Sequence, residues 1–131
     1  MANPNIANAS SILGTTTFLT PSGTSAVVLL PNAASSNQVF KINQIVAANV
    51  NGTNAVDTTV SIYSNGGVAQ GSAPSGGTAF PIASTISVPA DASLVVVDKT
   101  TAIYLMENQS IIVTSGTGSG ITYSVSYEVI S

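Results

Sequence analysis

The sequence of 131 residues contains no histidine, cysteine, arginine or tryptophan. Its charged side chains are two lysines and five carboxylates, 5% of the chain, against about a quarter in ordinary soluble domains. Most enzymes need a tuned acid, base, nucleophile or metal ligand, and the side chains that supply these roles are the scarce ones here. The composition therefore predicts a structural or interaction protein and not an enzyme.

The few groups that could support chemistry have simpler interpretations. A serine triad is impossible without histidine. Asp91 and Asp98 flank an expected strand and Glu107 lies in a later turn, so nothing places two carboxylates across a cleft, as a glycosidase requires. The asparagine-rich segment 49–57 contains one carboxylate, Asp57, whereas calcium usually takes two or more, so turn-forming asparagines are the better interpretation. We expect no catalytic residue, no cofactor and no metal.

Two classes of partner are also disfavoured. Binding to nucleic acid needs clustered cationic side chains, and Lys41 and Lys99 are isolated. The longest apolar runs, 26–30 and 94–97, are far shorter than the ~18 residues of a membrane span. The first ten residues have neither the basic nor the hydrophobic part of a secretory signal. We expect neither a nucleic-acid nor a membrane partner.

What the chain has in abundance is short runs of valine, isoleucine, threonine and tyrosine, separated by glycine, proline, asparagine and serine. This pattern is typical of all-β sandwiches and barrels. We predict a single antiparallel β-sandwich over residues 15–131, jelly-roll-like, with an immunoglobulin-like sandwich as the alternative. The expected strands are 15–20, 24–30, 38–50, 56–64, 78–82, 85–88, 93–98, 102–106, 110–115 and 121–130.

Three local patterns refine this expectation. The alternation of apolar side chains changes phase near Asn43 and Gln44, which predicts a bulge or a sheet corner there. The run 94–97 is apolar on both faces, which predicts a strand covered on both sides, either by the rest of the protein or by another subunit. The glycine-rich segment 115–120 predicts a hairpin between the last two strands.

Residues 1–14 lack strand periodicity and form an expected extended arm, with Ile6, Ile12 and Leu13 as its apolar anchors. An arm of this kind is normally disordered unless a neighbouring subunit or its own domain holds it. A surface with so few charges is poorly protected against association, so we predict a homo-oligomer or larger assembly. The candidate inter-subunit contacts are Ile6, Ile12, Leu13, Leu94 and Val96.

Three segments carry a resemblance: ISVPADASLVVVD at 86–98, AIYLMENQSIIVTS at 102–115 and YSVSYEVIS at 123–131. With their surroundings, over residues 38–131, they resemble small structural proteins in the virions of tailed phages, especially cyanophages. The chain departs from that pattern at Met106, Asn108 and Gln109, where acidic residues are more usual. The resemblance implies a structural component of a virus particle.

The leading functional expectation is a capsid decoration or cement protein, which binds the outer shell and stabilises it. Its partners would be other virion proteins, above all the major capsid protein. It would be made in the host cytoplasm and lie on the capsid exterior. One alternative is a neck, tail or fibre component of the same kind of particle. A second alternative, from another class, is a carbohydrate-binding β-sandwich module.

Overall fold

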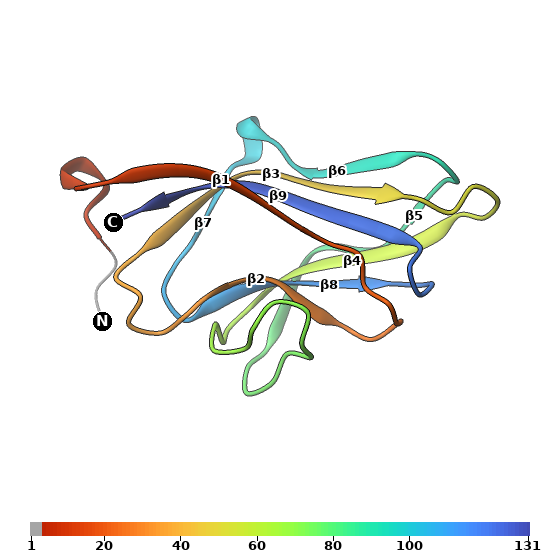
Figure 1. Ribbon diagram of the computed structural model, residues 1–131, viewed down its shortest axis with the longest axis horizontal. Helices are drawn as coiled ribbons and strands as arrows, with labels where there is room; N and C mark the ends of the chain where they lie inside the picture. The colour runs from red at the N-terminus through yellow and green to blue at the C-terminus, as the bar shows by residue number, and fades with distance from the viewer. Residues whose placement is uncertain (1–3) are drawn as a thin grey trace.

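The computed structural model describes residues 4–131 as two antiparallel β-sheets packed face to face (Figure 1). Nine strands and two short 3-10 helices make up this part of the chain. The elements are η1 (Ile6–Asn8), β1 (Ile12–Leu19), β2 (Val27–Asn32), β3 (Val39–Asn49), β4 (Val56–Tyr63), β5 (Ala79–Val88), β6 (Ser93–Val97), η2 (Lys99–Thr101), β7 (Ile103–Leu105), β8 (Gln109–Ser115) and β9 (Ile121–Ile130).

The strand order is that of a jelly roll. Sheet I has the order β1-β9-β3-β6, with β7 also pairing with β3, and sheet II has the order β2-β8-β4-β5. Strands β6 and β7 pair with successive parts of the same edge of β3, so together they occupy one strand position. The first strand then pairs with the last, the second with the last but one, and so on inward to β4 and β5. This wrapping confirms the jelly-roll prediction over the immunoglobulin-like alternative.

The core lies between the two sheets, and the burial of side chains alternates along its strands. In β9 the side chains of Ile121, Tyr123 and Val125 are fully buried, and the residues between them are not. In β3 both Ile42 and Ile45 are buried in this core, because the register shifts between Ile42 and Gln44. The predicted bulge is therefore confirmed, and it returns the side chains of β3 to the core after Asn43.

A second, smaller apolar cluster lies on the outer face of sheet II. Val28, Tyr63 and Ile112 form it, and Val68 of the long segment 64–78 packs against it. Two backbone hydrogen bonds hold this segment along the free edge of β2, from Val28 N to Ser72 O at 2.9 Å and from Gly71 N to Val28 O at 2.8 Å. The segment, green in Figure 1, therefore covers both the outer face and one edge of sheet II.

Two expected strand boundaries differ from the structure. Strand β2 does not stop at Pro31 but pairs with β8 as far as Asn32, because an edge strand can use a residue that lacks an N–H. The two short strands expected at 78–82 and 85–88 are one strand, β5, which passes through two register shifts against β4. The gap that the sequence predicts between two strands, at residues 83 and 84, is therefore part of one strand that contains two bulges.

Two larger expectations are corrected. The predicted hairpin at 115–120 is wrong, because β8 lies in sheet II and β9 in sheet I, so this segment crosses from one sheet to the other. The predicted arm is shorter than residues 1–14, because β1 begins at Ile12. Ser11 also exchanges two hydrogen bonds with Ser131, of 3.1 and 3.0 Å. The arm therefore joins the sheet of its own domain from Ser11 onward, and its first three residues lie outside the described part of the chain.

Candidate interaction surface

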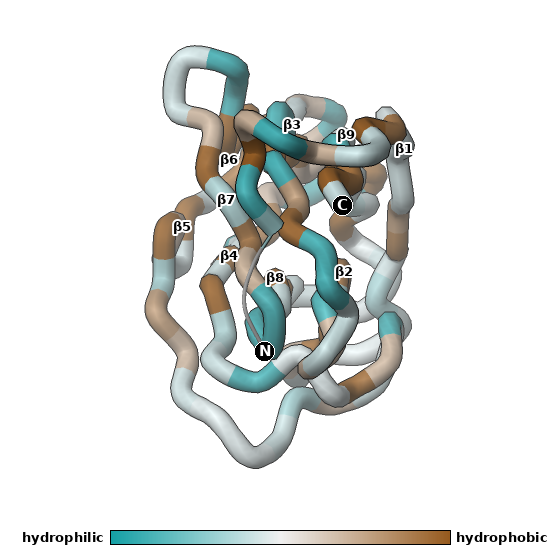
Figure 2. Tube along the Cα trace, turned by 90° about the vertical axis from the view of Figure 1, so that its left-hand side faces the viewer, coloured by the Kyte–Doolittle hydropathy of each residue, from teal (hydrophilic) through white to brown (hydrophobic). Residues whose placement is uncertain are grey.

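The outer face of sheet I carries a row of side chains that crosses the whole sheet. The strand register places Phe18 beside Ser124, Ser124 beside Val46, and Val46 beside Val95. Phe18 is 70% exposed and Val95 is 52% exposed, although both are large and apolar. In Figure 2, where sheet I lies above sheet II, this face forms the upper surface of the molecule. We call it the outer face of sheet I below.

The outward residues next to this row are uncharged: Thr16, Gln44, Ala48, Ser93, Thr122 and Ser126. The charged residues of the same strands, Lys41 and Glu128, lie opposite each other farther along β3 and β9. Thr16 and Ser126 hydroxyls bond to each other across the strands at 2.9 Å, which uses part of their hydrogen-bonding capacity within the sheet. Covering neutral hydroxyls and apolar side chains costs far less than desolvating charges. This half of the outer face is therefore suited to lie against another protein.

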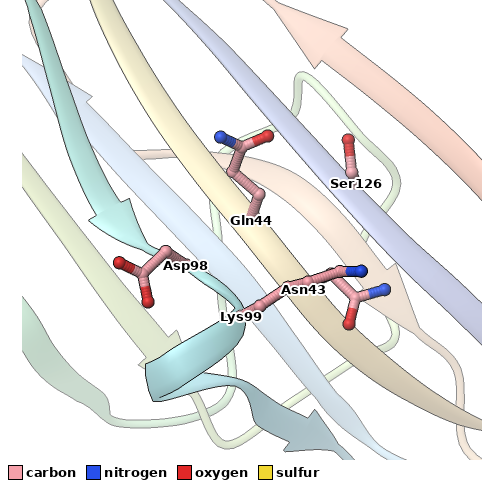
Figure 3. Close-up of a pocket in the computed structure, with 5 residues that line it drawn as sticks. All are labelled: Asn43, Gln44, Asp98, Lys99 and Ser126. Atoms are coloured by element: carbon pink, nitrogen blue, oxygen red, sulfur yellow. The ribbon is translucent and has the colours of Figure 1, made fainter.

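A polar pocket lies at the end of this face (Figure 3). It has a volume of about 440 Å³ and is lined by Asn43, Gln44, Asp98, Lys99 and Ser126. It forms where the bulge of β3 meets η2, the turn that separates β6 from β7. Asn43 donates a 2.9 Å hydrogen bond from Nδ2 to Glu128 Oε2. The pocket therefore combines amide groups with a carboxylate and an ammonium group, without an aromatic side chain in its lining.

The carboxylate of the pocket already has a structural task. The hydroxyl and the backbone N–H of Thr100 both donate to Asp98, and these bonds hold the pKa of the Asp98 carboxyl below its usual value. Thr101 in turn accepts from the backbone N–H of Asp98, which completes a capping box for η2. Asp98 therefore fixes the turn between β6 and β7, and a ligand would have to share its oxygens with the cap.

The four tyrosines do not form a common stacking face. Tyr123 is fully buried, its hydroxyl is bonded to the Thr58 hydroxyl, and it donates to the Thr114 carbonyl at 2.9 Å. Tyr127 packs its ring against Phe40, with 5.1 Å between the centroids. Tyr123 and Tyr127 therefore serve packing within the protein. Tyr123 reaches from sheet I to two residues of sheet II, so it links the sheets as well as filling the core.

Alkaline pH is expected to destabilise the protein through these two phenols. Burial raises the pKa of Tyr123 and of Tyr127 above the ordinary value of 10.0. A group whose folded pKa is higher than its unfolded pKa contributes stability below the unfolded value and loses it as the pH rises further. The free energy of unfolding should therefore stay level up to about pH 9 and fall above pH 10. Denaturant titrations over this pH range measure the free energy of unfolding. In Tyr123→Phe this free energy should fall less steeply above pH 10. An equally steep fall in the variant would show that Tyr123 is not the cause.

The asparagine-rich segment forms a turn whose side chains bind its own backbone. Asn49 donates to the Asn54 carbonyl at 3.0 Å and to the Val88 carbonyl at 2.8 Å. Asn51 accepts from the N–H groups of Thr53 and Asn54 at 2.9 and 3.1 Å. The turn-forming interpretation is therefore confirmed. Within residues 4–131, no group of three or more acidic, histidine or cysteine side chains is placed to hold a metal ion.

The sequence-predicted contact residues fall into two separate groups. Ile6 in η1 and Ile12 and Leu13 in β1 are 45%, 59% and 63% exposed, so they are accessible to a partner. Leu94 and Val96 are half-buried and pack against the core of their own chain, on the opposite edge of sheet I.

The exposed apolar side chain of β6 is that of Val95. The choice of Leu94 and Val96 as contacts stays a prediction, but Val95 is the more accessible apolar side chain of this strand, which its own chain covers on one side. Sequence reasoning also missed Phe18.

Within the described residues, no helix has the length and apolar character needed to cross a membrane.

The geometry defines a class of protein, a small jelly-roll β-sandwich with an uncharged row of side chains across the outer face of one sheet. Comparison with protein-family models and with curated proteins finds no match. Among solved structures, the chain is similar to a chain of the T13 IBDV viral particle, with a TM-score of 0.47 and 7% identity. The match covers 93% of this chain and 31% of that chain, so this chain spans about a third of its length. A match at this level carries no argument about function.

Proposed function

We propose that the protein is a structural component of a virus particle, a decoration protein that lies on the outer shell of a tailed-phage capsid and binds the major capsid protein. The observation that carries this proposal is the outer face of sheet I, which presents Phe18 and Val95 on a sheet surface whose neighbouring outward side chains are uncharged. A sheet surface that is uncharged and partly apolar around such a row is well suited to burial against another protein.

Three further observations support the proposal. Charged residues make up 5% of the chain, so a free molecule has little protection against association. The topology is a jelly roll, an architecture shared by viral capsid domains, lectins and cupins, although a fold alone does not decide function. Residues 38–131 resemble small virion proteins of tailed phages. In this proposal the protein acts by surface burial and not by catalysis.

A charge on the outer face should abolish attachment. Val95→Glu places a carboxylate at the β6 end of the proposed interface, where an unpaired buried charge costs several kcal/mol, equivalent to at least about a 30-fold loss of affinity. The measurement is sedimentation of the variant with undecorated particles. Met106→Glu is the matched control, because Met106 is similarly exposed but lies in the turn after β7. Equal binding by Val95→Glu and the original protein would remove this face from the interface.

The position in the particle is tested by copy number. Hundreds of copies in each particle support shell decoration, and about a dozen support the neck, tail or fibre alternative. If the proposal is correct, particles made without the protein should survive heating less well. Equal survival together with a low copy number would overturn the decoration proposal.

The expectation that the N-terminal arm tethers the protein to a neighbour, with Ile6 as an exposed anchor, stays a prediction for the same assay.

Carbohydrate binding remains the second candidate because of the pocket of Asn43, Gln44, Asp98, Lys99 and Ser126. Amide and carboxylate groups of this kind can bond to sugar hydroxyls. Glycan-array binding that Gln44→Ala removes, while particle binding is unchanged, would favour this alternative.

A further inference from the structure

The two sheets have four edges, and three of them are protected against pairing with another strand. The edge of β2 is bonded to the backbone of residues 71 and 72. The edge strand β5 contains Pro81 and two register shifts against β4. The last edge is divided between the short strands β6 and β7, with η2 between them. Coverage, bulges, proline and short length are the usual means of preventing edge-to-edge association.

The fourth edge, β1, is approached at one end by Gln70, whose side-chain amide donates to the Thr17 hydroxyl at 3.0 Å, and otherwise has none of these protections. Residues 12–19 read ILGTTTFL, without a charge or a proline, and pair with β9 in one unbroken register. Most of these residues are exposed. An edge strand of this kind is an open template for another strand.

The backbone groups of β1 that face outward can be assigned from its pairing. Ser11 and Ser131 exchange both of their N–H···O bonds, and such pairs alternate along an antiparallel ladder with pairs that exchange none. Every second residue from Ser11 onward therefore bonds to β9. The residues between them, whose N–H and C=O groups are directed away from β9, are Ile12, Gly14, Thr16 and Phe18. The side-chain amide of Gln70 approaches the Phe18 carbonyl at 3.5 Å. A carbonyl oxygen has two lone pairs, so this oxygen can still accept a second hydrogen bond.

We propose that two copies of this chain pair through β1, antiparallel and about a two-fold axis at Thr15. In this register all four outward residues form bonded pairs, Ile12 with Phe18 and Gly14 with Thr16, each twice, giving about eight backbone hydrogen bonds. Ile12 and Phe18, which also share the outer face of sheet I, are 59% and 70% exposed in the single chain. Each would then cover the other across the axis, as cross-strand apolar pairs do.

A second copy fits this edge better than another partner for two reasons. The strand is complementary to itself, because Ile12 and Phe18, two of its three exposed large apolar residues, lie at equal distances from Thr15 and no charge opposes its own copy. The other three edges are protected, so two copies that pair through strands would each use β1. Such an isologous contact uses both open edges and closes at a dimer. It joins the two copies of sheet I into one continuous sheet, whether or not the protein coats a particle.

Disulfide trapping tests the axis on the isolated full-length protein, which has no cysteine of its own. Thr15 would face its own copy in a non-bonded pair, where the Cα atoms are ~4.5 Å apart, within the range of a disulfide. Thr15→Cys should therefore give covalent dimers on mild oxidation. Thr16→Cys, whose copies would lie beyond the ~7 Å limit, should not. Equal cross-linking of the two variants, or none by Thr15→Cys, would overturn the proposed axis.

Charge exchange tests the register in solution. Ultracentrifugation should show a dimer of the original protein and monomers of Ile12→Lys and of Phe18→Glu, all with similar melting temperatures because both side chains are exposed. The double variant Ile12→Lys/Phe18→Glu puts opposite charges across each pair and should restore the dimer. A monomeric original protein, or a double variant as monomeric as the single ones, would refute the pairing. Val95 lies on the opposite edge of sheet I, so Val95→Glu tests the proposed particle face separately from this pairing.

Discussion

Replacing Gly66 with alanine is expected to destabilise the protein by about 3 kcal/mol or more. A Cβ atom at this position would lie 2.0 Å from the carbonyl oxygen of Asn32 and 2.7 Å from that of Gln109. Both are backbone atoms in or beside paired strands, so they cannot rotate away as a flexible side chain could. Relief requires that segment 64–78 move off sheet II, which would uncover Val28 and Tyr63.

The neighbouring glycine provides a matched control for this prediction. At Gly67 the nearest atom to an added Cβ is the side-chain oxygen of Asn65, at 3.3 Å, and this side chain can adjust. Gly67→Ala should therefore change stability by less than about 0.5 kcal/mol. Denaturant unfolding of the two variants gives the comparison directly. Similar losses in both would mean that the close approach of Gly66 to β2 is not what limits the position.

The second large effect is expected at the hydroxyl that joins the two sheets. Tyr123→Phe removes one oxygen from a fully buried site and leaves the buried Thr58 hydroxyl without that partner. An unsatisfied buried polar group costs about 1–3 kcal/mol, so the variant should lose stability in that range without a change of volume in the core. Tyr127→Phe, which keeps the ring that packs on Phe40, should cost less.

A double-mutant cycle separates the hydrogen bond from packing. Thr58→Val alone removes the other partner, and we expect it to cost about 1 kcal/mol or more. The pair Tyr123→Phe/Thr58→Val replaces both polar groups by apolar ones, so its loss should be clearly smaller than the sum of the single losses. Additive losses would show that the two hydroxyls do not stabilise the protein through each other.

The fold was largely predictable because a β-strand records burial with a period of two. The alternation in β9 assigned Tyr123 and Val125 to the core, and the phase change near Asn43 located the bulge of β3. The asparagines of segment 49–57 identified their turn because asparagine binds its own backbone. In each case the signal lies within a few residues of the structure that it predicts.

The features that the sequence did not predict depend on which sheet a strand joins, and the local sequence does not determine this. The glycines of segment 115–120 predict a reversal of the chain, but they fit a crossing between sheets as well as a hairpin. In the run 94–97 every residue is apolar, so no alternation could show that Val95 faces outward. The surface role of Phe18 likewise depends on the row that it forms with Ser124 and Val46, on strands distant in sequence.

The pairing of β1 with β9 joins the first strand of the chain to the last, and this has a consequence for synthesis. At ~5–20 residues per second a ribosome needs many seconds to deliver β9 after β1 has emerged. During that time β1, whose sequence ILGTTTFL is uncharged, has neither of its edges paired. Folds dominated by such distant contacts also close slowly, in milliseconds to seconds once complete. The nascent chain is thus open to aggregation through the strand that starts its sheet, and chaperone dependence should increase when translation is slowed.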